Sequence, residues 1–244
     1  MERVRKKYYC NWLINMNILC TICARANSKG LKNKNFKILN NKPLIAHTVE
    51  LAKKINFFSK IVLSSDSEKI YKINNKYNLD YIIKRSKNLS GDKVGKVKVI
   101  QDALKKTEKK FNVKFDYIFD LDVTSILRNK SDIIRSFKKI RTEKANNLVS
   151  VTEAKKNPYF NMIEYSKYKK FHLSKKLKKG VFSRQSAPKV YELNASIYIW
   201  KRKALLNFKK LINNKTTIYL MPRKRSIDID EKIDMEIVKL FING

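Results

Sequence analysis

Short apolar runs and amphipathic segments alternate along most of the chain. The apolar runs have the length and composition of buried strands, and they span 18–24, 60–64, 81–83, 117–121, 147–151, 193–200 and 218–221. Between them, apolar residues recur at helical spacing, which predicts helices after Pro43, after Ser67, around 94–104, and over 133–140, 204–212 and 231–241. Repeated strand–helix units predict an α/β fold, a mostly parallel sheet with helices on both faces.

Two stretches interrupt this alternation. Residues 1–15 are basic and aromatic, and we interpret them as an N-terminal extension of unknown role, with Met16 as an alternative start. They are too short and too polar for a secretory signal. Residues 154–190 are rich in aromatic and basic side chains and fit neither period. We therefore predict a single domain over 16–244 from which residues 154–190 project as an inserted arm.

The charge of the chain suggests a polyanionic partner. The 244 residues include 56 Lys+Arg against 21 Asp+Glu, a formal net charge of +35, and clustered cations bind nucleic acid by neutralising phosphates. However, 45 of these cations are lysines, scattered singly and in pairs, and only 11 are arginines, the better bidentate phosphate ligands. We therefore attribute most of the charge to solvated helix faces, and a basic nucleic-acid-binding protein remains the alternative from another class.

The cysteine and apolar content indicates in which cellular compartment the protein resides. Three cysteines cannot form a closed disulfide framework, so we expect a cytoplasmic protein. No apolar stretch reaches the roughly 18 residues of a membrane span, and we expect no membrane partner. Cys20 and Cys23 have CxxC spacing but lie in a predicted strand, where their side chains point to opposite faces, so we expect no zinc or redox site. His47 and His172 lack neighbouring metal-ligand residues and are expected to be structural.

Ligands in open α/β sheets bind beyond the carboxyl ends of the strands, so the loops that follow the strands are the candidate sites. The loop 24–35 after the first strand combines Arg25 and Lys34 with small residues, and its backbone N–H groups can cradle phosphates. Its glycine spacing matches neither a Walker P-loop nor GxGxxG, and an ordinary basic loop remains the alternative. For the loop 64–67 after the second strand, a helix N-cap is a sufficient explanation.

Two pairs of aspartates have i, i+2 spacing. Asp120 and Asp122 end the fourth predicted strand, and Asp228 and Asp230 lie between apolar residues in the stretch 225–231. Residues two apart in extended chain face the same side, so each pair can share a ligand. Mg²⁺ binds through one or two carboxylates plus phosphate oxygens, which favours the second pair as a metal site. A strand end or a helix N-cap is the alternative for each pair.

Six motifs in colinear order resemble the acylneuraminate cytidylyltransferases, also called CMP-sialic acid synthetases. They include Ala-Arg-x-x-Ser-Lys-Gly, Asp-Val-Thr-Ser-x-Leu-Arg, Arg-Gln-x-x-Pro-x-x-Tyr-Glu-Leu-Asn-Ala and Arg-Ser-Ile-Asp-Ile-Asp, and the resemblance covers residues 17–241. It implies a Rossmann-like nucleotide-diphospho-sugar transferase fold. The implied reaction transfers CMP from CTP to the anomeric hydroxyl of a nonulosonic acid, a nine-carbon acidic sugar such as sialic or legionaminic acid, and releases pyrophosphate.

The resemblance also implies Mg²⁺ as the cofactor and a homodimer formed through the inserted arm. A nearer alternative is another sugar nucleotidyltransferase, such as 3-deoxy-manno-octulosonate cytidylyltransferase. The Arg-Gln and Asp-Val-Thr-Ser motifs favour the nine-carbon group over that eight-carbon alternative.

Residue roles follow from the resemblance position by position. The implied CTP-binding residues are Arg25, Asn27, Ser28, Lys34, Asn35 and Arg85. The implied sugar-binding residues are Asp122, Thr124, Ser125, Arg128, Arg184, Gln185 and Asn194. The implied metal ligands are Asp228 and Asp230. In catalysis Arg25 and Lys34 are expected to stabilise the leaving pyrophosphate, while Asp228 and Asp230 are expected to hold the ion that polarises the α-phosphate.

The chain departs from the family pattern at three places. The common Gly-Gly of the first loop is Ala26-Asn27, and the usual Pro of Thr-Ser-Pro-Leu-Arg is Ile126. The Gln that is common in sialic acid enzymes is Asp122. An acid next to an acidic sugar implies metal binding or a different nonulosonic acid, and the resemblance at this position is to legionaminic-type enzymes.

Overall fold

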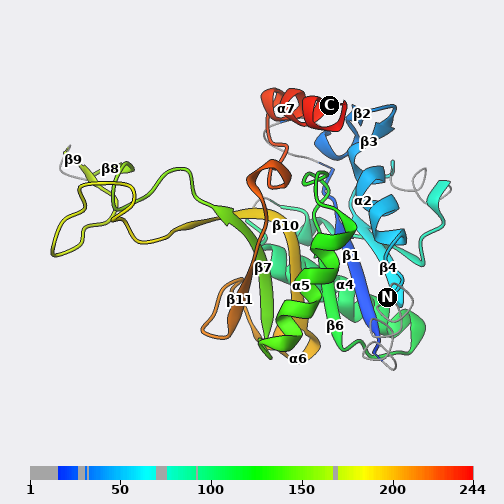
Figure 1. The fold of residues 1–244 in the computed structure, drawn as a ribbon. Helices are drawn as coiled ribbons and strands as arrows, with labels where there is room; N and C mark the ends of the chain where they lie inside the picture. Colours follow the sequence, from blue (N-terminus) through cyan, green and yellow to red (C-terminus); the bar gives the residue numbers. More distant parts are fainter. Residues whose placement is uncertain are drawn as a thin grey trace, which may run out of the picture.

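A seven-stranded sheet forms the centre of the protein (Figure 1). The structure, a computed structural model, describes residues 16–26, 31, 33–69, 76–91, 93–166 and 170–243. In spatial order the strands are β11 (Thr216–Leu220), β7 (Asn147–Glu153), β10 (Tyr191–Lys201), β6 (Tyr117–Leu121), β1 (Ile18–Cys23), β4 (Lys60–Ser65) and β5 (Tyr81–Lys84). Only β10 runs antiparallel to its neighbours. The predicted α/β fold with a mostly parallel sheet is confirmed.

Helices cover both faces of the sheet. On one face α2 (Leu44–Lys53), α5 (Lys130–Thr142) and α7 (Lys232–Asn243) share a core with the sheet, and on the other α4 (Lys96–Phe111) and α6 (Arg202–Asn207) form a second core. Strand β1 shows why the apolar run is continuous: Cys20 lies in the first core, whereas Leu19 lies in the second and Cys23 packs against it. A central parallel strand must be apolar on both faces.

The chain after β1 contains more structure than its polar sequence indicated. A short helix, η1 (Lys34–Phe36), is followed by the hairpin β2 (Ile38–Leu39) and β3 (Lys42–Pro43). Its turn residues Asn40 and Asn41 have φ of 45° and 61°. Asparagine tolerates this left-handed backbone better than most residues, which suits a two-residue hairpin turn.

One predicted helix is too long. The helix expected over 204–212 is α6, which ends at Asn207. The amide of Gln101 donates to the carbonyl oxygens of Leu205 (2.6 Å) and Phe208 (3.2 Å), so a side chain from α4 accounts for two carbonyl groups at the helix end. The helix predicted after Ser67 lies largely outside the described residues, as does the extension 1–15.

Residues 154–190 project from the sheet between β7 and β10 (Figure 1, left). They include a small hairpin of β8 (Ile163–Tyr165) and β9 (Phe171–Leu173). Because β10 pairs antiparallel with β7, with Tyr191 opposite Glu153, the arm leaves and rejoins the sheet at one edge. This is the edge at which the parallel strands end.

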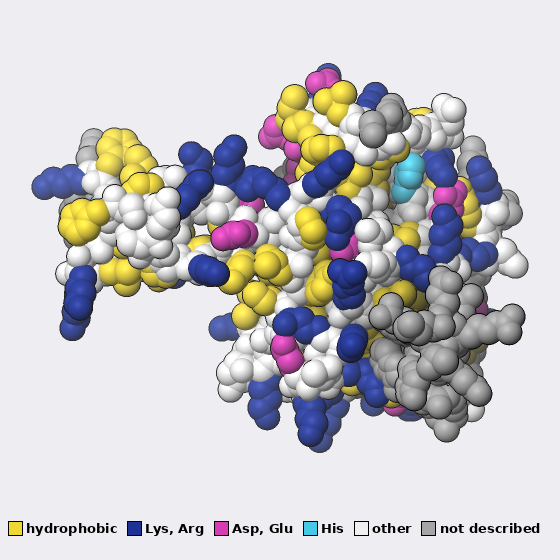
Figure 2. Space-filling model, viewed as in Figure 1, with side chains coloured by type: hydrophobic (Ala, Val, Ile, Leu, Met, Phe, Trp, Pro, Cys, Tyr) yellow, Lys and Arg dark blue, Asp and Glu magenta, His cyan; other side chains and the backbone are white. Residues whose placement is uncertain are grey.

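Basic side chains are spread over the molecule. Figure 2 shows lysine and arginine on the arm and over the visible face of the sheet domain, with other residues between them. None of the described helices has the length and apolar composition needed to cross a bilayer.

Candidate active site

A cavity of about 310 Å³ lies at the carboxyl edge of the sheet. Residues that follow β1, β5 and β6 line it, together with η1 and the start of α4, and its charged or amide side chains are Arg25, Lys34, Asn35, Arg85, Lys96 and Asp122. Four of the six residues implied to bind CTP therefore converge here. The other two, Asn27 and Ser28, lie outside the described residues.

The cationic wall of the cavity is fixed by the end of β4. The guanidinium of Arg85 is nearly buried and donates from Nη2 to the carbonyl oxygen of Ser64 at 2.8 Å. The backbone N–H of Ala26 donates to Oδ1 of Asp66 at 2.7 Å. The loop 64–67, for which a helix cap was a sufficient explanation, therefore anchors the phosphate-loop candidate. Asn35 adds a second anchor, because its amide donates to the carbonyl oxygen of Arg25 at 2.9 Å.

The metal-candidate segment lies against the same cavity. Nζ of Lys34 is 2.6 Å from Oδ1 of Asp230, and the N–H of Ile229 donates to the carbonyl oxygen of Thr124 at 3.2 Å. Burial and the negative charge of Asp122 raise the pKa of Asp228. Asp122, Asp228 and Asp230 thus form one acidic group opposite the cations, although 108 residues separate the last from the first.

One atom of this group suits a cation. Oδ1 of Asp228 is buried and has no hydrogen-bond partner among the described residues, and a bound ion satisfies such an oxygen. In the described parts of the chain, no three His, Cys, Asp or Glu side chains are arranged to hold a metal. The donor set therefore fits an ion that completes its coordination with phosphate oxygens, as Mg²⁺ does, rather than a closed protein site.

Lys96 is a site residue that the sequence analysis missed. Its ammonium group donates to Oδ2 of Asp120 at 3.1 Å and to Oδ2 of Asp122, and lies 4.4 Å from the ring centroid of Tyr198. Burial opposes ionisation of Asp122, but the positive charge of Lys96 outweighs it and lowers the pKa of that carboxyl. Two of only five glycines, Gly91 and Gly95, precede this helix start, which is a signal that could have been used.

Four residues implied to bind the sugar are buried: Thr124, which also lines the cavity, and Ser125, Arg128 and Asn194. Arg128 donates to the carbonyl oxygens of Asp122 (2.6 Å) and Ser196 (2.9 Å). The amide of Asn194 accepts from Ser150 and donates to Ser226, and Ser125 donates to the carbonyl oxygen of Asn194. These hydrogen bonds show that the side chains hold the loops together, and the expected contacts of these residues with the sugar stay predictions.

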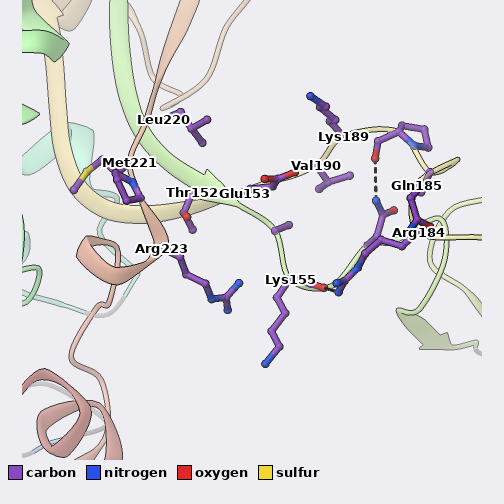
Figure 3. A pocket seen from close by; sticks show the side chains of 15 residues that line it. Thr152, Glu153, Lys155, Arg184, Gln185, Lys189, Val190, Leu220, Met221 and Arg223 are labelled. Atoms are coloured by element: carbon purple, nitrogen blue, oxygen red, sulfur yellow. Dashed lines mark hydrogen bonds between the residues drawn. The ribbon is translucent and has the colours of Figure 1, made fainter. Parts of the chain in front are cut away.

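Arg184 and Gln185 lie at a second cavity, of about 740 Å³ (Figure 3). It lies between the base of the arm and the end of β11, and Lys155, Lys189 and Arg223 also line it. Nη2 of Arg184 donates to the carbonyl oxygen of Lys155. The two cavities share no lining residue. Within one chain, the structure therefore does not bring the arm residues to the acidic group.

Solved structures of other proteins share this fold. The chain superimposes on CMP:2-keto-3-deoxy-manno-octonic acid synthetase complexed with CTP with a TM-score of 0.64 at 15% identity, covering 93% of this chain and 98% of that one. It superimposes on a 4-diphosphocytidyl-2C-methyl-D-erythritol synthase with a TM-score of 0.67 at 10% identity, covering 93% and 100%. At these identities the likeness shows the fold.

Sequence relatives are closer. The chain is 41% identical to the post-translational flagellin modification protein B of Campylobacter coli, over 92% of this chain and 94% of that protein. It is 38% identical to the CMP-N,N'-diacetyllegionaminic acid synthase of Campylobacter jejuni, over 93% and 95%. A family model described as cytidylyltransferase matches residues 19–241. This match spans nearly the whole chain and includes the residues that line the cavity of about 310 Å³, so the chain belongs to the cytidylyltransferase family.

Proposed function

We propose that this cytidylyltransferase transfers CMP from CTP to the anomeric hydroxyl of a nonulosonic acid of legionaminic type. The observation that carries the proposal is one cavity lined by the cations Arg25, Lys34, Arg85 and Lys96 and by Asp122, with Asp230 paired to Lys34. Transfer of a phosphoryl-type group needs positioning and charge neutralisation more than a covalent catalyst, and this cavity offers both. The sugar class is supported by the relative that is a CMP-N,N'-diacetyllegionaminic acid synthase.

In the proposed reaction the sugar hydroxyl oxygen forms a bond to the α-phosphorus of CTP while the bond to the bridging oxygen of the β-phosphate breaks. The hydroxyl proton passes to solvent, and pyrophosphate leaves. Arg25 and Lys34 orient the triphosphate and stabilise the charge that develops on the leaving group. Arg85 is nearly buried and hydrogen-bonded to Ser64, so it presents a fixed positive charge to the nucleotide.

We infer that Mg²⁺ is the cofactor and that Asp228 and Asp230 hold it together with phosphate oxygens. When bound, the ion supplies Lewis-acid polarisation of the α-phosphate. Asp228 provides a buried oxygen that has no hydrogen-bond partner in the described part of the chain, and Asp230 is more exposed and paired with Lys34. The exposed pair between Lys34 and Asp230 can open as both residues turn to their ligands, because exposed ion pairs are weak.

We further propose a homodimer in which the arm of each copy completes the sugar site of the other with Arg184 and Gln185. The arm carries apolar side chains that are unusually exposed, among them Ile163 (66%), Phe171 (71%) and Phe182 (91%). Exposed apolar groups of this size on one projection mark an interaction surface. A guanidinium is also a suitable bidentate partner for a sugar carboxylate.

A cytoplasmic location is proposed with this function, because CTP is available there.

Pyrophosphate release in the presence of CTP and Mg²⁺ tests the function. The acceptor panel contains N,N'-diacetyllegionaminic, N-acetylneuraminic and pseudaminic acids, with the eight-carbon 3-deoxy-manno-octulosonic acid as the matched control. We expect the fastest release with the legionaminic acid and a CMP-sugar product of the corresponding mass. Release with the eight-carbon acid alone would establish the alternative enzyme, and no release with any acid would contradict the proposal.

A further inference from the structure

The position of Lys96 resembles that of a bound cation. Its Nζ lies between two carboxylates from one strand end, Asp120 and Asp122, and over the face of the Tyr198 ring. An aromatic face attracts an ammonium group but offers no lone pair to a metal ion. The surroundings therefore suit the ammonium that is present.

The buried carboxylate depends on this ammonium. Asp120 has no exposed surface, and its other oxygen accepts from the hydroxyl of Thr21 at 2.7 Å. A buried ionised carboxylate is strongly unfavourable unless a cation pairs with it. Asp122 is also fully engaged, because its Oδ1 accepts from Oγ1 of Thr124 at 3.1 Å while its Oδ2 accepts from Lys96. Among the described residues, Asp228 supplies the buried oxygen of this acidic group that has no hydrogen-bond partner.

We propose that the ammonium of Lys96 occupies a cation position between Asp120 and Asp122, so that the site has one cation of its own and takes its divalent ion at Asp228. The proposal also explains how an acid, Asp122, can stand where sialic acid enzymes commonly have glutamine, because Lys96 neutralises the added negative charge. The role of the site rests on the proposed nucleotidyl transfer, but the number of bound ions does not. Lys96 is thereby assigned as a positioning residue for the carboxylate group.

Manganese binding without nucleotide tests this proposal. Replacing Lys96→Ala empties the position while leaving the two carboxylate oxygens, so a divalent ion is expected to enter. Free Mn²⁺, measured by electron paramagnetic resonance, should show one more ion bound per chain than in the unaltered protein. Lys98→Ala, an exposed lysine on the same helix, is the control and should bind the unaltered number. Lys96→Ala combined with Asp120→Asn should lose the extra ion.

Thermal unfolding supplies a second readout. In EDTA, Lys96→Ala should melt below the unaltered protein, and Mn²⁺ should raise its melting temperature at concentrations that do not shift Lys98→Ala. An unchanged ion count in Lys96→Ala would overturn the proposal. So would a Lys96→Ala protein that stays unfolded with Mn²⁺ while the double variant folds, since a metal would then be unable to replace the ammonium. A failed transfer assay would leave these counts unaffected and would weaken only the proposed function.

Discussion

At the scale of single residues, neighbouring carboxylates in the site differ in how readily they ionise. Burial opposes ionisation of both Asp122 and Asp228. Lys96 reverses this at Asp122 and lowers its pKa, whereas the charge of Asp122 adds to burial at Asp228 and raises its pKa. Asp122 is therefore the counter-ion of Lys96, whereas ionised Asp228 would be stabilised by a bound cation.

Asp228→Asn should separate activity from stability. A carboxyl whose pKa is raised by folding stabilises the fold below its unfolded pKa, and that contribution is lost as pH rises through the folded pKa. At pH 7 the metal-free protein carries an unfavourable charge, so the Asn variant should melt higher in EDTA, and the difference should shrink as pH falls below the ordinary carboxyl range.

The Mg²⁺-dependent pyrophosphate release of Asp228→Asn should fall roughly 100-fold or more, as it does when other groups that stabilise transition-state charge are removed. The exposed Glu236→Gln is the control and should change neither property. Retained turnover in Asp228→Asn would remove this residue from the mechanism.

The sequence predicted the site residues that short loops bring together at the strand ends. It missed what depends on how deeply a side chain is buried or on a partner far away in the sequence. Lys34 and Arg85 line the cavity because a parallel sheet brings the ends of its strands to one edge. Lys96 escaped prediction because its partner Asp120 lies 24 residues further along the chain. The two motifs that contain Arg128 and Asn194 were recognised, but a motif does not reveal that both side chains are buried.

At the scale of elements, an ion pair between the half-buried Arg225 and the buried Asp132 joins the segment that carries Asp228 to helix α5. Arg225, at the end of η3 (Arg223–Arg225), donates from Nε and Nη2 to the two carboxylate oxygens of Asp132 at 2.9 and 2.8 Å. Asp132 has no exposed surface and also forms the capping box of α5 with Asn129. The start of α5 therefore positions the backbone that leads to the metal-candidate residues.

Arg225→Met should leave the carboxylate of Asp132 buried without its main partner. The expected loss in unfolding free energy is about 3 kcal/mol, since removal of one member of a buried pair exposes the other to the full desolvation penalty. Turnover should also fall at temperatures well below the melting point, where the variant is still folded, because the Asp228 segment loses its anchor. Chemical denaturation and steady-state kinetics measure the two effects. Arg223→Met alters an exposed residue of the same helix and should leave stability unchanged; equal effects of both variants would refute the anchoring role.

At the scale of the whole molecule, the net charge separates into two parts. In the cavity of about 310 Å³, Lys34 and Lys96 are paired with acids, whereas other lysine and arginine side chains are dispersed over the visible face of the molecule (Figure 2). Dispersed charge on two copies is repulsive, and salt screens repulsion between exposed charges. The proposed dimer must therefore rely on apolar contacts of the arm.

Phe171→Asp combined with Phe182→Asp should convert the proposed dimer into a monomer, because two charges would replace exposed apolar groups of the arm. Light scattering coupled to size exclusion reports the mass. The monomer should still bind CTP but lose transfer to the sugar. Leu240→Asp places one such charge on an exposed residue of α7, 74% accessible, and should leave the mass unchanged. Dissociation by Leu240→Asp alone would move the interface to that helix.

The antiparallel position of β10 has a further consequence. Since β7 and β10 are neighbours, the arm is topologically the loop of one β-hairpin, and its two ends are held together by the sheet. Closing a flexible loop becomes only about 0.6 kcal/mol less favourable for each doubling of its length. Insertions, deletions or exchange of the arm are therefore compatible with an unaltered nucleotide cavity. In evolution or in engineering, this arrangement makes the arm a module that can diversify while the CTP chemistry is inherited unchanged.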